Sequence, residues 1–442
     1  MSEAPATPPK VQPFRAPVGT RDVLPPESAR WEALIASFAE AVGGAGYGLI
    51  QSPMFEELGV FSRMGEGTDV VRKEMYDFHD KGDRHLALRP EGTASVARAF
   101  VEHRPVVPWK VWYATPVFRY ERPQAGRYRQ HHQLGVEAIG AEDPDLDVEC
   151  MVLLADWYAE LGLRRVDLVI NTMGAPSDRV AYADAVRTYL RAHLGELAAD
   201  DAAKVEDHPL RVLDTKRAES QAVVAGAPTI LDSLAPEAIA HFERVQAGLT
   251  AAGVAYEVDT RLVRGLDYYT HTLFEFRSGA LDAAQSTIGG GGRYDGLVGA
   301  LGGPPTPGVG FGSGIERVLL TCDAEGTFGA PATLVDVFVV DVSGGDAARD
   351  LTTELRRAGL RVDRAWGGRS MKAQRKAADR SGAPWAVLVG EDELAAGTAT
   401  VRDLRDRSGQ QAVGRHDLVD HLRRLVASPP TSPTTDAAQE TT

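Results

Sequence analysis

The feature that most constrains the fold is the stretch PVFRYERPQAGRYRQHHQLGVE at residues 116–137. Strand-forming residues precede and follow a break at residues 123–126, which predicts two antiparallel strands joined by a long basic loop. Because side chains two residues apart share one face of a strand, Gln133, Gly135 and Glu137 are expected to point together. The lack of a side chain at Gly135 would leave room for a ligand above the sheet.

The charges on this hairpin favour ligand binding over simple exposure. Arg119, on the first strand, carries a planar guanidinium that suits bidentate contact with a phosphate or a carboxylate. The alternative is an exposed hairpin whose charges are solvated. His131 and His132 are expected on opposite faces of the second strand, which argues against a metal site built by the pair.

The size of the chain predicts several domains. At 442 residues it exceeds what one hydrophobic core holds, so two or three domains are expected. No apolar run is long enough to span a bilayer and the first residues have no apolar core typical of a secretion signal, so we expect a cytoplasmic protein. Cys150 and Cys322 are far apart in sequence and are expected to be buried as small apolar residues.

The overall charge bears on the kind of partner. A net charge of −14 argues against a nucleic acid when the chain is taken as a whole. The charge is uneven, however, because residues 331–426 hold 16 Lys and Arg against 14 Asp and Glu, a balance of +2 that leaves −16 for the rest. Since phosphate contacts depend on local patches, a neutral to basic domain can still bind RNA.

Changes of pattern along the chain predict its domains. Residues 1–17 and 427–442 are rich in Pro, Ala and Thr and are expected to be disordered. Residues 18–325 mix helices with strands and contain a helical insertion at about 176–255. Residues 331–426 alternate strands with helices, as a small α/β domain does.

Two local elements are predicted within the larger domain. A strand is expected from Tyr47 to Phe55, with Pro53 inside it. An amphipathic helix is expected to open at Ser177, as its cap, and to run to Leu197.

Two further strings carry residues suited to charged ligands. In ALRPEGTASVARAF at 87–100, Glu91 and Thr93 stand at the start of a helix, where capping of that helix explains them equally well. In RLVRGLDYYTHTLFEF at 261–276, Arg264 lies beside a glycine at the mouth of a strand. This placement suits the close approach of an anion, although an ordinary surface arginine is the alternative.

Two glycine-rich strings complete the set. IGGGGRYDGLVGALGG at 288–303 is neither a Walker loop nor a dinucleotide fingerprint, and its glycines admit close approach of either a ligand or a neighbouring strand. GVGFGSGIERVLL at 308–320 leads from a glycine strand into a helix that bears Glu316 and Arg317. Arg317 would face a phosphate if the ligand is a nucleotide, and a surface ion pair with Glu316 is the alternative.

In their order along the chain, these strings resemble the histidyl-tRNA synthetases, a family of class II aminoacyl-tRNA synthetases. FRYE at 118–121 and the ending QLGVE resemble motif 2, Pro53–Glu56 resembles motif 1, and residues 308–320 resemble motif 3. The resemblance runs from about residue 19 to residue 426. It implies an α+β fold, in which an antiparallel class II sheet is flanked by helices and is joined by a helical insertion domain and a C-terminal α/β anticodon-binding domain.

The resemblance also implies a role for each matching residue. The histidine-binding residues would be Glu91, Gly92, Thr93, Gln133, Glu137, Arg264, Tyr268 and Tyr269. The ATP-binding residues would be Arg119, Glu121 and Arg317. Arg119 and Arg264 would be catalytic at the α-phosphate, and Arg122 and Gln124 would face the tRNA acceptor end. Magnesium would come with the ATP phosphates, without a metal cage built by the protein alone.

The reaction so implied is the activation of L-histidine by ATP to histidyl-adenylate, followed by transfer to the 3′ end of tRNA(His). Motif 1 implies a homodimer. One alternative is a non-catalytic paralogue that regulates ATP phosphoribosyltransferase; another is a pure RNA-binding module, which leaves the clustered carboxylates and arginines unexplained. Tyr120 and His131 depart from the family's pattern, which is expected to affect only details of the loop.

Overall fold

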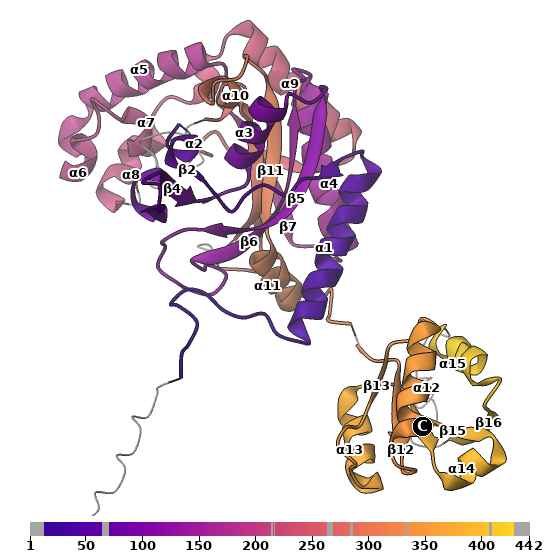
Figure 1. Cartoon of the computed structure of the whole chain (residues 1–442). Coiled ribbons are helices and arrows are strands. Elements are labelled where there is room, and N and C mark those ends of the chain that lie inside the picture. The colour runs from indigo at the N-terminus through magenta and orange to yellow at the C-terminus, as the bar shows by residue number, and fades with distance from the viewer. Residues whose placement is uncertain are drawn as a thin grey trace, which may run out of the picture. The chain divides into compact units, whose positions relative to one another are not determined.

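The computed structural model describes residues 13–63, 70–213, 215, 217–262, 268–282, 286–331, 334–405 and 409–427. It divides into two compact units: the larger one holds Arg30–Gly329 and the residues up to Leu24, and the smaller one holds the residues from Ala330 onward together with Pro25–Ala29. Figure 1 shows the course of the chain through each unit.

An eight-stranded sheet forms the centre of the larger unit, in the order β1-β5-β6-β11-β10-β9-β7-β8. Neighbouring strands run antiparallel except for the edge pairs β1 with β5 and β7 with β8. The strands are β1 Gly48–Leu49, β5 Trp109–Phe118, β6 Gln130–Ile139, β7 Val166–Thr172, β8 Tyr256–Val258, β9 Thr270–Ser278, β10 Thr287–Arg293 and β11 Gly308–Gly314. The predicted antiparallel hairpin is confirmed as β5 and β6, in which Tyr113 pairs with Gly135.

The glycines of β10 and β11 let strands approach one another. A Cβ on Gly291 would lie 1.9 Å from the carbonyl oxygen of Gly310, and one on Gly292 would lie 2.4 Å from that of Thr272. Both distances are far inside van der Waals contact, so only glycine fits. Of the two explanations left open by the sequence, the neighbouring strand is therefore the one that the structure supports at these positions.

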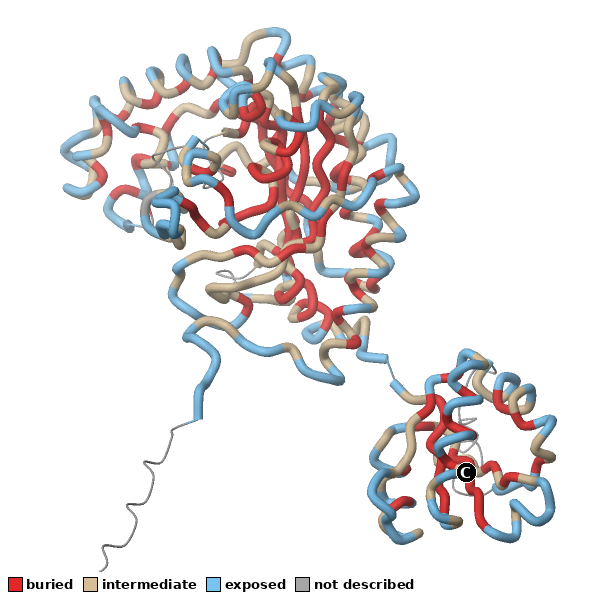
Figure 2. Tube along the Cα trace, in the orientation of Figure 1, coloured by how far each residue is buried: buried red, intermediate tan, exposed pale blue. Residues whose placement is uncertain are grey.

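The two faces of the sheet carry different layers. On one face, the buried β6 residues Leu134, Val136 and Ala138 pack in a large core with helices that include α1 and α4. The other face is covered in part by α3 and α10, through a second cluster that contains Phe100 and Leu297. Figures 1 and 2 show the buried strands between these helices. The helices of these layers are α1 Glu27–Gly44, α3 Thr93–His103, α4 Pro144–Glu160, α9 Pro236–Ala251, α10 Leu297–Ala300 and α11 Ile315–Glu325.

The prediction of one strand from Tyr47 to Phe55 is wrong. Its two ends belong to different sheets, since β1 pairs with β5 whereas β2 joins a separate three-stranded sheet in the order β2-β4-β3. Pro53, which cannot donate to a ladder, lies in the irregular segment between them. The small sheet and its neighbours are β2 Phe55–Glu57, α2 Leu58–Ser62, the π-helix η1 Val70–Glu74, β3 Asp77–His79 and β4 His85–Leu88.

Helices dominate the chain between β7 and β8 and form a core of their own, which includes Tyr182, Val186 and Val223. They are α5 Pro176–Ala192, η2 Leu194–Glu196, α6 Ala199–Ala202, α7 Pro209–Val212, α8 Ala218–Ala225, η3 Ile230–Ser233 and α9. The predicted cap at Ser177 is wrong, because α5 begins one residue earlier and Ala175 is its N-cap. The Asp178 carboxylate instead accepts the Ala175 amide at 2.9 Å.

The smaller unit is a five-stranded sheet in the order β13-β12-β14-β15-β16. Alternate residues of β12 divide its core: Val337 and Val339 pack with α12 and α15, whereas Phe338 and Val340 pack with α13. The elements are β12 Val337–Asp341, α12 Asp346–Arg357, β13 Val362–Arg364, α13 Met371–Ser381, β14 Trp385–Val389, α14 Glu391–Ala396, β15 Thr398–Asp403, β16 Gln410–Gly414 and α15 Leu418–Ala427. The sequence patterns missed α14 and β16, which are short and mostly exposed.

Two predictions on bulk properties can be compared with the structure. Cys150 and Cys322 are both buried free thiols, as predicted. Across the part of the chain that is described, none of the helices combines the length and the apolar character needed to cross a membrane.

Candidate active site

A fully buried carboxylate, Glu137, forms the floor of the site. It accepts hydrogen bonds from Thr93 Oγ1 at 2.7 Å, from Tyr113 Oη at 3.1 Å and from Tyr294 Oη at 2.5 Å. These donors come from α3, from β5 and from the residue after β10, so three separate segments meet at one side chain. Gly310 on β11 makes room for the carboxylate, because a Cβ there would lie 2.1 Å from Glu137 Oε2.

Burial governs the ionisation of this group. Burial is the main reason that the pKa of Glu137 rises to about 8; the nearby Glu91 contributes to the rise, while the hydroxyl donors Tyr294, Thr93 and Tyr113 act in the opposite direction. A carboxyl that titrates near neutral pH can exchange its proton with a ligand's imidazole or accept a hydrogen bond from it.

A second buried carboxylate, Glu91, lies close to the first. It accepts a hydrogen bond from Tyr268 Oη at 2.9 Å and one from the Ala94 amide at 3.3 Å. The amide of Gly92 donates to Gln133 Oε1 at 3.2 Å, which joins the start of α3 to β6. The explanation of Thr93 as a helix cap is wrong, because Gly92 is the N-cap and the Thr93 hydroxyl donates to Glu137.

The space above Gly135 is filled by protein. Both Gly92 and Gly135 face the Tyr113 ring, and a Cβ on either would lie 2.4 Å from Tyr113 Cζ. The expectation that Gly135 leaves room for a ligand is therefore wrong: the room accommodates Tyr113, which lies across from it on β5. Gln133, Gly135 and Glu137 do share the predicted face, opposite the core residues Leu134 and Val136.

Two arginines with ligand-binding chemistry are anchored by backbone carbonyls. Arg119 Nε donates to the Pro90 carbonyl at 2.9 Å, next to Glu91. Arg317 donates to the carbonyls of Gly126 at 3.1 Å and Thr287 at 2.7 Å. Burial lowers the pKa of Arg317, and the neighbouring guanidiniums of Arg127 and Arg119 add to that effect. Cations held together in this way favour an anionic ligand.

The alternative of a surface ion pair between Glu316 and Arg317 is wrong. The Glu316 carboxylate is buried and accepts the His132 amide at 3.0 Å, and it also lies 3.0 Å from His132 Nδ1. Successive residues on α11 point in different directions, so Glu316 holds β6 while Arg317 turns toward Gly126 and β10.

His131 belongs to the site, which the sequence did not predict. Burial is the main reason that its pKa falls to about 3, and the positive charges of Arg119 and Arg317 contribute to that fall. Its imidazole is therefore neutral at physiological pH and lies near both arginines. His131 lies on β6 and shares the face of Gln133 and Glu137. The expectation that it affects only details of the loop stays a prediction.

The loop between β5 and β6 presents the remaining predicted residues. Glu121 Oε2 lies 2.7 Å from Arg127 Nε in an ion pair. Gln124 and Arg127 exchange backbone hydrogen bonds at 3.1 and 2.9 Å around Gly126, whose φ of +67° suits glycine. Arg122 and Gln124 are exposed at this turn, where a large ligand can reach them.

The tyrosine pair lies at the start of β9. The rings of Tyr268 and Tyr269 are 4.7 Å apart, and Tyr268 also meets Tyr294 edge-on at 6.0 Å. Tyr269 is buried against apolar residues that include Met173 and Leu273. The predicted catalytic residue Arg264 lies outside the described residues.

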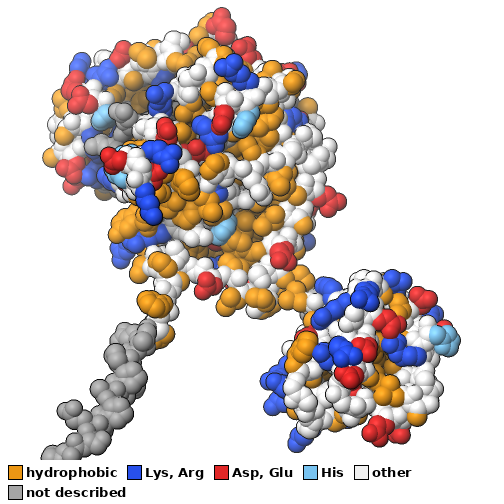
Figure 3. Space-filling model, in the orientation of Figure 1, with side chains coloured by type: hydrophobic (Ala, Val, Ile, Leu, Met, Phe, Trp, Pro, Cys, Tyr) orange, Lys and Arg blue, Asp and Glu red, His pale blue; other side chains and the backbone are white. Residues whose placement is uncertain are grey.

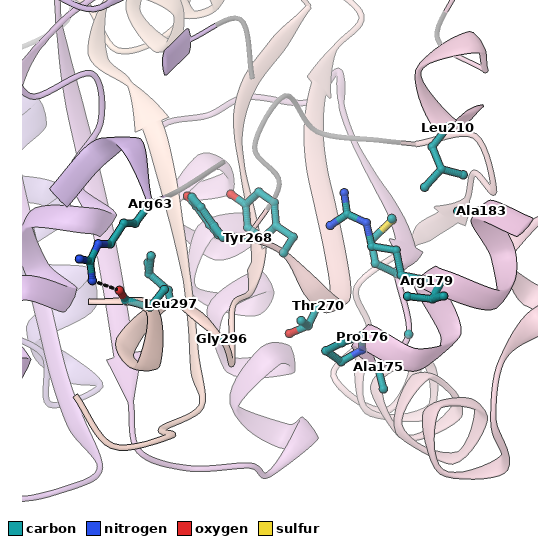
Figure 4. Close-up of a pocket in the computed structure, with 15 residues that line it drawn as sticks. Arg63, Ala175, Pro176, Arg179, Ala183, Leu210, Tyr268, Thr270, Gly296 and Leu297 are labelled. Carbon is teal, nitrogen blue, oxygen red and sulfur yellow. Dashed lines mark hydrogen bonds between the residues drawn. The ribbon is translucent and has the colours of Figure 1, made fainter. Parts of the chain in front are cut away.

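A cavity of about 510 Å³ adjoins the two tyrosines (Figure 4). It lies between the start of β9 with α10 on one side and helices α5 and α7 on the other, and its walls include Tyr268, Thr270, Arg179 and Leu210. Neither Glu91 nor Glu137 lines it. It therefore neighbours the carboxylate site without containing it.

Sequence reasoning missed two hydroxyl donors to Glu137, those of Tyr113 and Tyr294. Tyr113 had a usable signal, because strand alternation places it on the same side of the sheet as its partner Gly135. The sequence gives no such signal for Tyr294, because its hydrogen bond to Glu137 depends on β10 and β6 both pairing with β11.

The described residues hold no group of three or more His, Cys, Asp or Glu side chains that could bind a metal ion.

Comparison with known proteins extends these observations over the whole chain. A family model described as "Histidyl-tRNA synthetase" matches residues 19–318, and one described as "Anticodon binding domain" matches residues 336–425. The histidine–tRNA ligase of Moorella thermoacetica is 47% identical over 418 residues, which cover 93% of this chain and 98% of that protein. That of Rhodococcus erythropolis is 48% identical over 424 residues, covering 94% and 99%. The crystal structure of apo S. aureus histidyl-tRNA synthetase superposes with a TM-score of 0.79 at 35% identity, covering 93% of this chain and 100% of that one.

Proposed function

Because the chain belongs to the histidyl-tRNA synthetase family, we propose that it activates L-histidine with ATP and transfers the histidyl group to the 3′ end of tRNA(His). The family and the α+β fold class predicted from the sequence are confirmed. The proposal rests on one observation. Two buried carboxylates, Glu91 and Glu137, and several arginines lie near one another on the same part of the sheet.

The carboxylates suit the two polar ends of histidine. Glu91 would bind the ammonium group, with Thr93 and Gln133 as further hydrogen-bond partners, since a cation prefers a carboxylate and neutral acceptors. Glu137 would bind the imidazole, aided by Tyr269 from β9. An amino acid without ring nitrogens would offer the buried Glu137 no N–H donor in addition to its three hydroxyl partners, which disfavours its binding relative to histidine.

The arginines suit the triphosphate. Arg119, anchored beside Glu91, would contact the α-phosphate, and Arg317 would bind toward the γ-phosphate. Glu121, which forms an ion pair with Arg127, would contribute to ATP binding as well. Arg264, carried over from the family's pattern, would reach the α-phosphate from the other side. Magnesium would bind with the ATP phosphates and would add to the neutralisation of their charge.

The activation step requires that histidine and ATP are aligned and that the negative charge on the phosphate oxygens is compensated. A carboxylate oxygen of histidine attacks the α-phosphorus, the bond to the bridging oxygen of the β-phosphate breaks, and pyrophosphate leaves. Charge accumulates on the phosphate oxygens during this step, and Arg119 and Arg264 would stabilise it at the α-phosphate. In the second step a terminal ribose hydroxyl of tRNA attacks the carbonyl carbon and AMP leaves with the proton on its phosphate. In this scheme the protein holds the reactants in position, and no side chain needs to act as a strong general base.

The activation step is tested by histidine-dependent exchange of pyrophosphate into ATP, beside the other amino acids and with Arg264→Ala. Exchange with histidine alone, and its loss in the variant, would support both the reaction and the role of Arg264. A folded protein that exchanges with no amino acid would favour the regulatory paralogue instead. The match of residues 336–425 to an anticodon-binding domain speaks against that alternative.

The exposed loop residues Arg122 and Gln124 are proposed to contact the acceptor end of the tRNA. Arg122→Ala should weaken charging of tRNA while leaving pyrophosphate exchange unchanged, because the side chain is exposed whereas Glu91 and Glu137 are buried. Equal loss in both assays would contradict this assignment.

We also propose a homodimer, in the cytoplasm where tRNA is charged. Met54 and Phe55, in the segment that resembles motif 1, are each 52% exposed, and the ring of Phe78, 41% exposed, lies 6.3 Å from that of Phe55. Exposed apolar side chains at a protein surface favour burial against a partner. Sedimentation equilibrium should give twice the chain mass of 47.5 kDa, and Phe55→Asp should shift the equilibrium toward the monomer.

A further inference from the structure

Two histidines that the proposed reaction does not use stack on one another inside the larger unit. The rings of His241 and His271 lie 4.7 Å apart, and their planes differ by 26°. His241 belongs to α9, the last helix of the insertion between β7 and β8, whereas His271 belongs to the start of β9. The stack therefore joins the end of the helical insertion to the strand that begins directly after Tyr268 and Tyr269.

The backbone of His271 also contacts the beginning of the helical insertion. Its amide donates to the Gly174 carbonyl at 2.8 Å, and its carbonyl accepts the Met173 amide at 2.7 Å. Met173 and Gly174 connect β7 to α5, the first helix of the insertion. Figure 3 shows acidic and basic side chains over the surface where Figure 1 places α5 to α8, so the outer side of these helices faces solvent. One residue of β9 thus contacts the insertion where it begins and where it ends.

The start of β9 is irregular at this residue. The pairing of β10 with β9 skips His271 and Thr272, which form a bulge between Thr270 and Leu273. The φ of His271 is +46°, a left-handed conformation that residues other than glycine adopt rarely and at a cost. Such a conformation persists only where the surrounding structure holds it, and it is found most often at functional sites.

Ring stacking, rather than hydrogen bonding, holds the His271 side chain. Among the described residues its buried Nδ1 has no hydrogen-bond partner, and its Nε2 lies 4.0 Å from Asp295 Oδ2, beyond hydrogen-bonding distance. His241 is itself fixed, because its Nε2 lies 3.3 Å from Thr272 Oγ1 and 3.6 Å from Asp147 Oδ1. Burial lowers the pKa of His271, which favours a neutral ring that stacks without charge repulsion. The ring of His241 is therefore the main support of the His271 ring.

The bulge lies next to the proposed binding site for L-histidine. Tyr268 and Tyr269 precede His271 by three and two positions. Tyr268 Oη donates to the buried Glu91 at 2.9 Å, and Tyr269 is the residue proposed to assist in binding the imidazole. A shift of the backbone at His271 would move both tyrosine rings relative to the substrate, and small misplacements of this kind are costly.

We propose that His271, supported by His241, is a positioning residue for the binding of L-histidine. The bulge holds Tyr268 and Tyr269 in place, and a displacement of the helical insertion reaches the two tyrosines through the contacts of His271. This inference rests on the proposed function and adds two residues that act through the tyrosines rather than on the substrate.

The first test measures KM for histidine and for ATP in pyrophosphate exchange. His241→Ala removes the supporting ring and should raise KM for histidine by about 2- to 10-fold, the range of one aromatic contact, with KM for ATP unchanged. His241→Phe keeps a ring and should restore KM, whereas His241→Gln keeps a hydrogen-bonding group without a ring and should not. The matched control is His193→Ala, which should leave both constants unchanged. The His193 ring lies 4.4 Å from that of Tyr189, so its contacts stay within the insertion.

A double-variant cycle tests whether the two histidines act as a unit. His271→Asn removes the ring and keeps a residue that tolerates a left-handed backbone, so it should raise KM for histidine as His241→Ala does. Because both changes remove the same contact, the combined variant should be no worse than His271→Asn alone. Additive effects, an equal rise of both KM values, or a rescue by Gln but not by Phe at position 241 would overturn the proposal.

Amide hydrogen exchange supplies a measurement that needs no activity. The His271 amide, which donates to Gly174, should exchange faster in His241→Ala than in the unchanged protein, while the amides of β12 should exchange equally in both. Unchanged exchange at His271 would contradict its support by His241. If the unchanged protein activates no amino acid, the proposed function fails, and the exchange of the His271 amide still decides whether His241 holds the bulge.

Discussion

Thr93 Oγ1 donates a hydrogen bond of 2.7 Å to Glu137 Oε1, and this bond joins the first turn of α3 to the middle of β6. The two residues stand 44 positions apart in the sequence. Because the Thr93 hydroxyl makes this bond, it does not cap α3. It instead contacts the carboxylate that is proposed to recognise the imidazole of histidine.

Replacement of Thr93 by Val should impair histidine recognition. The variant keeps the shape of the side chain but loses the hydroxyl that stabilises the ionised form of Glu137, so the pKa of Glu137 should rise. We expect kcat/KM for histidine in pyrophosphate exchange to fall about 10-fold or more and its pH profile to move to higher pH. Thr93→Ser should restore both. A fall in kcat/KM without any shift of the profile would contradict this role.

Glu137→Gln should change how stability depends on pH. The folded-state pKa of about 8 lies above the ordinary value of 4.5, so the folded protein binds more protons than the unfolded chain between these values. The free energy of unfolding therefore decreases as pH rises from about 4.5 to about 8, by at most about 5 kcal/mol from this group. A neutral amide removes that contribution, so urea unfolding of the variant should show a flatter profile. The exposed Glu142 supplies the control: Glu142→Gln should keep the wild-type slope.

Gly310→Ala should disrupt the site through crowding alone. The added Cβ would lie 2.1 Å from Glu137 Oε2 and 2.3 Å from the Val136 carbonyl oxygen, and the backbone atom cannot move away without breaking the sheet. We expect a loss of stability of about 1–3 kcal/mol or more in urea unfolding, together with weaker histidine binding. Gly314→Ala, on the same strand with no atom within 4 Å of the added carbon, should be tolerated.

Arg317→Lys should impair ATP binding selectively. Lysine keeps the charge but cannot donate to both the Gly126 and Thr287 carbonyls while facing a phosphate. KM for ATP in pyrophosphate exchange should rise by about 10-fold or more, with KM for histidine nearly unchanged. Arg277→Lys, a partly exposed arginine on β9, is the comparison variant. A rise in KM for histidine alone would refute the assignment.

Asp147→Asn should destabilise the larger unit, although Asp147 is not one of the proposed site residues. Asp147 and Arg293 form an ion pair whose side chains are 0% and 1% exposed, and Arg293 also donates to the carbonyls of Ala141 and Asp143. Loss of the carboxylate leaves the buried guanidinium with only Asp295, 3.4 Å away and 33% exposed, as a counter-charge, at a cost of up to about 3–5 kcal/mol. Asp145→Asn, on the same helix in an exposed pair with Arg244, should cost less than about 1 kcal/mol. Similar urea midpoints for the two variants would be inconsistent with this account.

Strand alternation made much of the site predictable. The pattern from Gln130 to Ile139 placed Gln133 and Glu137 on one face and the core residues on the other, and the β5–β6 pairing has that arrangement. Arg119 could be singled out by the chemistry of its guanidinium, and Arg317 by its place in a helix that follows a glycine-rich strand. The strand expected from Tyr47 to Phe55 failed because an irregular segment containing Pro53 moves the chain from one sheet to another, which a propensity pattern does not reveal.

The sequence by itself determined the family, the order of the elements and the polar face of β6, since these depend on local residue order and on the spacing of short motifs. Only the tertiary structure decided that Tyr113 and Tyr294 donate to Glu137, that Gly135 accommodates a tyrosine ring, and that His131 lies near two arginines. These relationships join residues through the register of the sheet and through burial. Register fixes which distant side chains meet, and burial sets the pKa of Glu137, so neither can be read from one segment alone.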